Sequence, residues 1–264
     1  MSLRFNLPQS WLNGRLKITV IGAGGTGSDL LVRLAKLHMQ LVALGGAGLD
    51  VTVYDADVVT AGNIGRQHFP PCSLGLNKAL MLVSSINLAY QLDWTGVPSH
   101  FDLDDSDHQQ SLRWGSDLVV CCVDKAVFRV ALCKAMRGVK TETMLLDCGN
   151  GRDLGQMVLG HLGIPRGLRL PNVFDLWPEI ADVDDTEEPS CSAHESMQKQ
   201  AWPVNQAVSF LAVELLWTLM RQGWTDYHGA TFQLAPMRTS PLMVDPASWA
   251  FMGYEAEGAL PKAA

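Results

Sequence analysis

The stretch Gly22-Ala23-Gly24-Gly25-Thr26-Gly27 lies between a predicted strand and a predicted helix, and it decides the fold. The apolar run over residues 16–21 ends at the first of these glycines, as a buried parallel strand does. From residue 26 to 44 apolar residues recur at helical spacing, and Gly45-Gly46 ends the run. Glycines in such a turn let backbone amides approach a phosphate, and the helix N-terminus supplies positive potential. The stretch therefore predicts a nucleotide-binding turn, with a plain tight turn as the alternative.

Outward from this turn, strands and helices alternate over the first 150 residues. Further strands are predicted over 49–54, 116–123 and 143–148, and helices over 77–89 and 126–137. This alternation predicts an α/β fold with a Rossmann-like, doubly wound and mostly parallel sheet. Beyond it we expect a C-terminal extension with a strand over 155–162, an irregular stretch over 171–178, a long helix over 203–221 and a closing strand over 229–234.

Two aspartates follow predicted strands. Asp55 comes after the strand over 49–54, 28 residues beyond Gly27, and Asp124 follows the strand over 116–123. Ligands in open parallel sheets bind beyond the carboxyl ends of the strands, where these carboxylates and the glycine turn converge. An acid in the position of Asp55 accepts hydrogen bonds from a pair of ribose hydroxyls. The glycine turn and Asp55 alone do not separate NAD, FAD, S-adenosylmethionine and ATP.

The segment after Asp55 carries two cations. Asn63-Ile64-Gly65-Arg66-Gln67 is followed by Gly75-Leu76-Asn77-Lys78 at the start of the next predicted helix. Taken singly, Arg66 and Lys78 are more often solvated surface residues. A dinucleotide dehydrogenase needs neither, whereas a triphosphate must have its charge neutralised while pyrophosphate leaves. Together, after a glycine turn and an acid, they indicate ATP.

Two roles are open for Asp124. With ATP bound, its carboxylate would hold Mg²⁺ through the phosphates. The alternative, which is compatible with the first, is that Asp124 is the N-cap of the helix predicted from Ala126.

This order of residues resembles the ThiF/MoeB/E1 superfamily of adenylyltransferases over roughly the first 150 residues. The resemblance rests on the glycine turn and on Asp55, Asp57, Asn63, Arg66, Gln67, Lys78, Asn87 and Asp124. The Asn-x-x-Arg-Gln segment is far more specific than the glycine motif. Within the superfamily, Pro189-Ser190-Cys191-Ser192 and Asn205 are similar to the ThiF-like protein of the plasmid-associated PRTRC gene cluster.

The resemblance implies ATP-dependent adenylation of the C-terminal carboxylate of a small ubiquitin-like (β-grasp) partner protein. It implies one domain over 1–264, with a nucleotide-binding half (1–150), a partner-binding and dimerisation half (151–264) and a mobile crossover loop near 179–195. We expect a homodimer. The implied cofactor-binding residues are Gly22, Gly24, Gly25, Gly27, Asp55, Asp57, Asn63, Arg66, Gln67, Lys78 and Asp124, the last also holding Mg²⁺. The implied catalytic residues are Arg66, Lys78, Asp124 and Cys191.

Cys191 lies after an acidic segment and before the long helix, where thioester-forming relatives place their nucleophile. A thiolate there would receive the acyl group from the adenylate. The alternative is an unreactive loop cysteine, because the neighbouring Glu187 and Glu188 disfavour a thiolate. The sequence leaves both possibilities open.

Two features of the superfamily are missing. The sequence contains no Cys-x-x-Cys pair, so we predict no structural zinc; Cys191 with His194 is at best a weak half-site. Relatives supply an arginine to the partner subunit from a short arginine-rich motif. Here the N-terminal candidates are Arg4 and Arg15, and neither belongs to such a motif, so the sequence leaves open whether an arginine is supplied in trans.

The composition, with 47% hydrophobic and 18% charged residues, is that of a folded globular chain. The net charge of −7 argues against nucleic acid as a partner. We expect no membrane association and a cytoplasmic location, because the apolar stretches are too short to span a bilayer and the N-terminus lacks a secretory pattern. Cys121, Cys122 and Cys148 fall in apolar runs, where buried reduced thiols are ordinary.

Two other function classes are alternatives. The first is a non-catalytic Rossmann module that holds a nucleotide or a partner. The presence of Arg66, Lys78 and Asp124 argues against it, because a degenerate module is free to lose them. The second is an NAD(P)-dependent oxidoreductase, which rests on the glycine turn and Asp55 and leaves the two cations unexplained.

Overall fold

The computed structural model describes residues 3–183 and 201–256. Its strands are β1 (Phe5–Asn6), β2 (Leu16–Ile21), β3 (Leu49–Tyr54), β4 (Thr95–Val97), β5 (Leu118–Cys121), β6 (Met144–Asn150), β7 (Leu154–His161), β8 (Trp224–Thr225), β9 (Tyr227–Leu234) and β10 (Met237–Met243). The α-helices are α1 (Gly25–Ala43), α2 (Lys78–Tyr90), α3 (Ser106–Gln110), α4 (Ala126–Ala135), α5 (Val173–Leu176), α7 (Val204–Gln222) and α8 (Pro246–Phe251). Short helical turns are η1 (Gln9–Leu12), η2 (Ala61–Asn63), η3 (Pro71–Ser73), η4 (Ser111–Gly115) and η5 (Pro178–Asp182).

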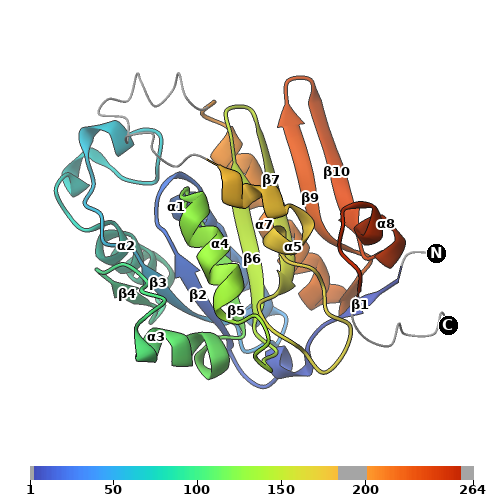
Figure 1. The fold of residues 1–264 in the computed structure, drawn as a ribbon. Coiled ribbons are helices and arrows are strands. Elements are labelled where there is room, and N and C mark those ends of the chain that lie inside the picture. Colours follow the sequence, from blue (N-terminus) through green and yellow to red (C-terminus); the bar gives the residue numbers. More distant parts are fainter. Residues whose placement is uncertain (1–2, 184–200, 257–264) are drawn as a thin grey trace.

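An eight-stranded sheet with the order β10-β9-β7-β6-β5-β2-β3-β4 takes strands from both halves of the chain (Figure 1). Strands β4, β3, β2, β5 and β6 are parallel. Strands β7, β9 and β10 extend the sheet with antiparallel pairs. The fold is thus the predicted Rossmann-like α/β fold with mixed strands in its C-terminal extension. The chain leaves β2 towards β3 on one side and returns as β5 on the other. Ligands of doubly wound sheets bind at such a switch point, so we expect the ligand site beyond Ile21, Tyr54 and Cys121.

Helices cover both faces of the sheet. Helices α1 and α7 pack against each other on one face, and α4 and α5 lie on the opposite face (Figure 1). The inner side of α1 carries Leu30, Leu31 and Leu34, which are fully buried, and β5 is buried along its whole length. Within the part of the chain that the structure describes, no helix is both long and apolar enough to cross a membrane.

Three sequence predictions were wrong in detail. The strand over 229–234 does not close the sheet, because β10 follows it and forms the edge. Most of β10 is exposed and it contains Pro241, so neither an apolar run nor alternation marks it as a strand. The stretch 171–178 contains α5, whose N-cap Asn172 accepts hydrogen bonds from two backbone amides. The N-cap of α4 is Lys125 and not Asp124.

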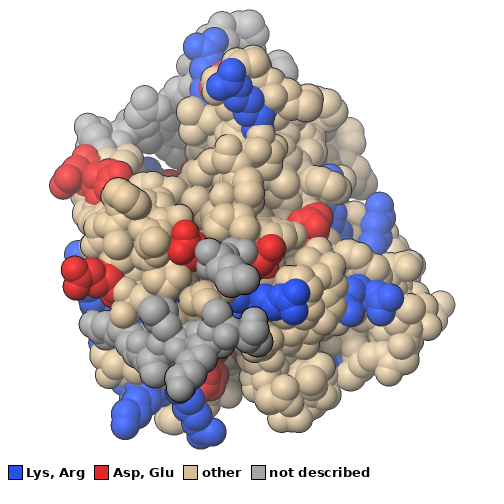
Figure 2. Space-filling view, turned by 90° about the vertical axis from the view of Figure 1, so that its right-hand side faces the viewer, with Lys and Arg blue, Asp and Glu red and all other residues tan. Residues whose placement is uncertain are grey.

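Figure 2 shows the side of the molecule on which β10 and α8 lie. Uncharged side chains dominate this side, and lysine, arginine, aspartate and glutamate are scattered over it. Met237 of β10 and Phe251 of α8 are among the most exposed large hydrophobic residues of the described chain.

The glycine turn between β2 and α1 is set by close backbone contacts. Gly22 has a φ of +95°, and a Cβ at this position would lie 3.0 Å from the carbonyl oxygen of Cys122. A Cβ at Gly27 would overlap the carbonyl oxygen of Gly22. The first turn of α1 therefore packs directly on the backbone of the preceding turn, which leaves no room for a side chain at Gly27.

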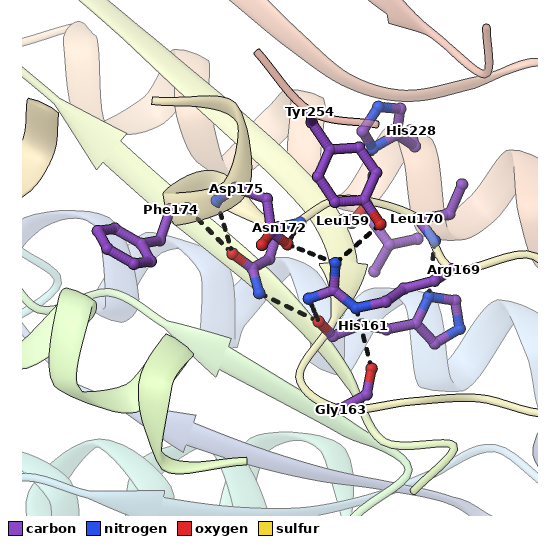
Figure 3. Close-up of polar contacts among 10 residues, drawn as sticks. All are labelled: Leu159, His161, Gly163, Arg169, Leu170, Asn172, Phe174, Asp175, His228 and Tyr254. Carbon is purple, nitrogen blue, oxygen red and sulfur yellow. Dashed lines mark hydrogen bonds and ion pairs between the residues drawn. The ribbon is translucent and has the colours of Figure 1, made fainter. Parts of the chain in front are cut away.

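A polar cluster joins β7, the loop after it and a residue near the described C-terminal end (Figure 3). The Arg169 guanidinium forms an ion pair with Asp175 at 2.8 Å and donates hydrogen bonds to the Tyr254 hydroxyl at 2.9 Å and the Gly163 carbonyl at 3.1 Å. Both charged side chains are nearly buried. Because a buried charge is costly unless it is paired, this cluster fixes the loop to the C-terminal segment.

Two buried histidines lie in and beside this cluster. The Nδ1 atom of His161 accepts a hydrogen bond from the Leu170 amide, and the Nδ1 atom of His228 donates one to the Leu159 carbonyl. The Nε2 atom of His228 accepts a hydrogen bond from the Trp249 indole at 3.1 Å, which fixes a neutral tautomer. Burial lowers the pKa of His161 to about 3 and that of His228 to about 4.

We expect the free energy of unfolding to fall as the pH drops from about 6.5, the pKa of an unfolded histidine, towards about 4. His161 and His228 stay neutral in the folded protein over this range, so the unfolded state binds more protons. Their contribution is complete above about pH 6.5 and declines below it, by about 1.4 kcal/mol per pH unit and histidine. Denaturant unfolding across this range measures the slope. His228→Gln should make the slope shallower, and an unchanged slope would contradict the assignment.

Gly27→Ala should lower the free energy of unfolding by roughly 1–3 kcal/mol, as overpacking does, because its Cβ overlaps the Gly22 carbonyl. Gly167→Ala is the matched control, since nothing lies within 4 Å of the Cβ it would add. Removing this second glycine should be neutral or slightly stabilising. Denaturant unfolding compares the two variants, and equal effects would refute the packing argument.

Candidate nucleotide-binding site

Asp55 joins the end of β3 to the glycine turn. Its Oδ2 atom accepts a hydrogen bond from the Ala23 amide at 2.6 Å, and its Oδ1 atom accepts one from the Asp57 amide at 2.8 Å. Burial raises the pKa of Asp55, and these two hydrogen bonds act in the opposite direction. Each carboxylate oxygen can accept more than one hydrogen bond, so the arrangement leaves capacity for a further donor such as a ribose hydroxyl.

Lys78 begins α2 and is paired with Asp57. Its Nζ atom lies 2.7 Å from the Asp57 Oδ2 atom, and its backbone amide donates to the Asp57 carbonyl at 2.9 Å. The lysine side chain is nearly buried, whereas that of Asp57 is exposed. The structure thus brings the two predicted residues into contact with each other. The ammonium group has three N–H donors, of which this ion pair requires one.

Asn63 organises the loop that carries Arg66 and Gln67. Its Oδ1 atom accepts hydrogen bonds from the Thr60 amide and hydroxyl at 2.9 and 3.1 Å. Its backbone carbonyl accepts hydrogen bonds from the amides of Arg66 and Gln67 at 3.3 and 2.9 Å. The Gln67 Oε1 atom is buried and receives no hydrogen bond from residues 3–183 or 201–256. Asn63 therefore shapes the loop with both its side chain and its backbone.

Arg66 and Asp124 lie close enough to influence each other. Burial lowers the pKa of Arg66, and the Asp124 carboxylate counteracts this effect. Arg66 is half-buried, whereas Asp124 is exposed just beyond β5. An arginine keeps its charge at any physiological pH. The structure thus places a fixed positive charge and a solvent-accessible carboxylate together, from two segments that are far apart in the sequence.

A polar cluster that the sequence prediction missed supports the glycine turn from α7. The Thr26 hydroxyl donates to the Asn205 Oδ1 atom at 3.0 Å, and the Asn150 amide donates to both residues at 2.8 Å. The Ser209 hydroxyl donates to the carbonyls of Thr26 and Asn205. The Asn205 side chain packs so close to Gly25 that a Cβ there would collide with it. The second half of the chain thereby holds the glycine turn in place.

A buried ion pair was also missed. The Arg129 guanidinium of α4 donates two hydrogen bonds to Asp147 of β6, at 2.9 and 2.5 Å, and Asp147 is fully buried. Burial acts to lower the pKa of Arg129, but the adjacent Asp147 carboxylate outweighs this effect and holds that pKa above its usual value. The sequence held one signal for this pair, since Asp147 interrupts the apolar run of β6 and a buried aspartate needs a partner. Beside this pair, burial raises the pKa of the Cys121 thiol to about 12, which keeps it protonated.

Cys121 and Cys148 are buried free thiols, as predicted, and Cys122 is half-buried. Cys191 lies outside the described residues. The predicted crossover loop near 179–195 begins in η5, and its residues from 184 onward lie outside the described chain as well. Among residues 3–183 and 201–256, no group of three or more histidine, cysteine, aspartate or glutamate side chains is arranged to hold a metal ion.

Solved structures share this fold. A crystal structure of PaaA aligns with a TM-score of 0.58 and 12% identity, over 87% of this chain and 64% of PaaA. E. coli MccB with ATP aligns with a TM-score of 0.55 and 15% identity, over 89% of this chain and 65% of MccB. The microcin C7 biosynthetic enzyme MccB in complex with N-formylated MccA gives 0.55 and 14%, over 89% and 66%. This chain thus spans slightly less than two thirds of the length of these structures.

No curated protein matches the sequence at a significant level. The family comparison does give a match, which extends over residues 10–241 and so includes the glycine turn, the Arg66 loop, Asp124 and α7. A match over most of the chain, together with the sheet order and the arrangement at its carboxyl edge, defines the family. The chain belongs to the ThiF family.

Proposed function

We propose that this protein uses ATP to adenylate a carboxylate. The observation that carries the proposal is the placement of the Arg66 guanidinium near Asp124, at the edge of the sheet where the glycine turn lies. A hydrogen bond from the His68 amide to the Ser28 hydroxyl ties this loop to the first turns of α1. A fixed cation beside a glycine turn is what a triphosphate needs and a dinucleotide does not. Membership of the ThiF family supports the same function.

In this proposal each predicted residue has a role that its contacts permit. The amides of the glycine turn and the N-terminus of α1 bind phosphate oxygens, and Asp55 accepts hydrogen bonds from the ribose. Arg66 neutralises the departing pyrophosphate. Lys78 assists it with the N–H donors that its ion pair with Asp57 does not use. The attacking carboxylate is a nucleophile at neutral pH, so it needs no general base. It forms a bond to the α-phosphorus as pyrophosphate leaves, and catalysis consists of positioning and charge neutralisation.

Mg²⁺ is part of the proposal. The exposed carboxylate of Asp124 is an oxygen ligand of the kind that Mg²⁺ prefers, and Mg²⁺ commonly binds one or two carboxylates together with substrate phosphates. When bound, such an ion would offset the negative charge of the triphosphate. The part of the protein would be to orient it through Asp124.

The proposed partner is a small ubiquitin-like (β-grasp) protein whose C-terminal carboxylate is activated. It rests on the superfamily resemblance, and the MccB structures with ATP and with N-formylated MccA support an enzyme that brings a nucleotide and a second molecule together. A homodimer, transfer of the acyl group to Cys191, and a place in the PRTRC gene cluster belong to the same proposal. The adenylate, a mixed anhydride, would acylate the Cys191 thiolate and release AMP.

Arg66→Ala should weaken Mg·ATP binding roughly 10- to 100-fold, the loss expected for charge-assisted hydrogen bonds. Calorimetric titration of the purified protein with Mg·ATP and, separately, with NAD⁺ measures this. Arg166→Ala, which removes an exposed arginine paired with Glu142 elsewhere, is the matched control and should leave affinity unchanged. NAD⁺ binding without ATP binding would favour the oxidoreductase. Binding of neither would favour the non-catalytic module.

Cys191→Ala should leave partner-dependent ATP–pyrophosphate exchange intact and abolish a thiol-sensitive covalent adduct with the partner. Adenylation precedes transfer to the thiol, so only the second step requires the sulfur. Cys72→Ala removes an exposed free thiol and is the matched control for the adduct. Exchange assays and intact-mass measurement with and without reductant follow the two steps. If the unmodified protein forms no adduct, the thioester step is wrong.

A further inference from the structure

Helix α1 is tied to the Arg66 loop by a tether made of Ser28, Asp29 and His68. The Asp29 Oδ1 atom lies 2.9 Å from the His68 Nε2 atom, and the His68 backbone amide donates to the Ser28 hydroxyl at 3.2 Å. An ionised carboxylate only accepts hydrogen bonds, so Nε2 carries the proton in this contact. Arg33, one turn further along α1, donates to the other oxygen of Asp29 at 2.6 Å.

The tether begins on a rigid element. Ser28 and Asp29 directly follow Gly27, where α1 packs on the glycine turn, and they precede the fully buried Leu30. Ser28 is itself fully buried, and the Asp29 side chain is only 11% exposed. Whatever is attached to these two residues is therefore held in a fixed position relative to the nucleotide-binding turn.

The other end of the tether is next to the cation of the site. His68 is two residues beyond Arg66, and Phe69 after it is buried. On the N-terminal side, the Arg66 amide donates a hydrogen bond to the carbonyl of Asn63. The arginine thus lies on a short stretch that is anchored on one side by the loop's own hydrogen bonds and on the other by α1.

Asp29 carries a negative charge at neutral pH. Although burial acts to raise its pKa, the hydrogen bonds from His68 and Arg33 outweigh burial and hold the pKa below its usual value. A nearly buried carboxylate is stable only with such partners. His68 is therefore an integral partner of a charged group, although about half of its side chain is exposed.

We propose that Asp29 and His68 are positioning residues that hold Arg66 at the phosphate side of the site. The inference rests on the proposed function and assigns a role to two residues that neither the glycine motif nor the Asn-x-x-Arg-Gln segment includes. An arginine placed in advance loses less freedom when it binds phosphate, and small displacements of such a group lower affinity and rate. The tether acts on the nucleotide only through Arg66.

A double-mutant cycle tests this. His68→Ala should raise the dissociation constant of Mg·ATP about 5- to 10-fold, and less than about twofold in an Arg66→Ala background, because the residue it positions is already gone. His68→Gln, which keeps a donor, should restore most of the affinity. His100→Ala is the matched control: it removes an exposed histidine that is not part of the tether, and should change the dissociation constant less than about twofold.

Hydrogen exchange without nucleotide gives a second readout. His68→Ala should speed amide exchange across residues 63–69, and His100→Ala should not. An equal loss of ATP affinity in both backgrounds, no loss at all, or unchanged exchange would overturn the inference. In each of these cases the proposed function stands as long as the unmodified protein binds ATP and Arg66→Ala weakens it. If the unmodified protein does not bind Mg·ATP, the proposed function fails, and this inference with it.

Discussion

The site depends on the contact between the first turn of α1 and the backbone of the glycine turn. Because Gly27 has no side chain, the first turn of α1 can pack directly against the Gly22 carbonyl, and only three residues separate α1 from β2. The Asp55 carboxylate then holds the Ala23 amide, which adds the end of β3 to the same point. From the other half of the chain, Asn205 of α7 packs on the turn. Two strands and two helices thus share one reference point, and displacement of the turn would move all of them.

The charges around this point are balanced in pairs. Lys78 is held by Asp57, and Arg66 lies within the field of Asp124. Asp55 adds a third carboxylate beside these two pairs. A bare triphosphate would meet repulsion here as well as attraction, and a divalent cation that accompanies it would remove the mismatch. This is the physical reason why ATP and Mg²⁺ belong to a single proposal.

The sequence was sufficient to predict β2, β3, β5 and β6 of the parallel half, because these strands are rich in apolar residues and end at a glycine or an acid. It did not predict the parallel strand β4, which has only three residues, Thr95-Gly96-Val97, and no apolar run. Helix α7 was predicted as the long helix over 203–221. Strand β10 was not, because its exposed residues neither alternate nor form an apolar run. The ion pair of Arg129 and Asp147 joins residues from different elements, and only the fold determines that they meet. Similarly, the sequence placed Asp57 and Lys78 in one site but gave no sign that they would pair.

Each border of the eight-stranded sheet has a feature that hinders pairing with a further strand. On one side β4 has only three residues, which offers little backbone for another strand to join. On the other side β10 contains Pro241, which has no N–H to donate. Both borders are therefore poor templates for sheet growth from one molecule to the next. Pro241, which helped to keep β10 out of the sequence prediction, thus also makes that border a poor site for intermolecular strand pairing.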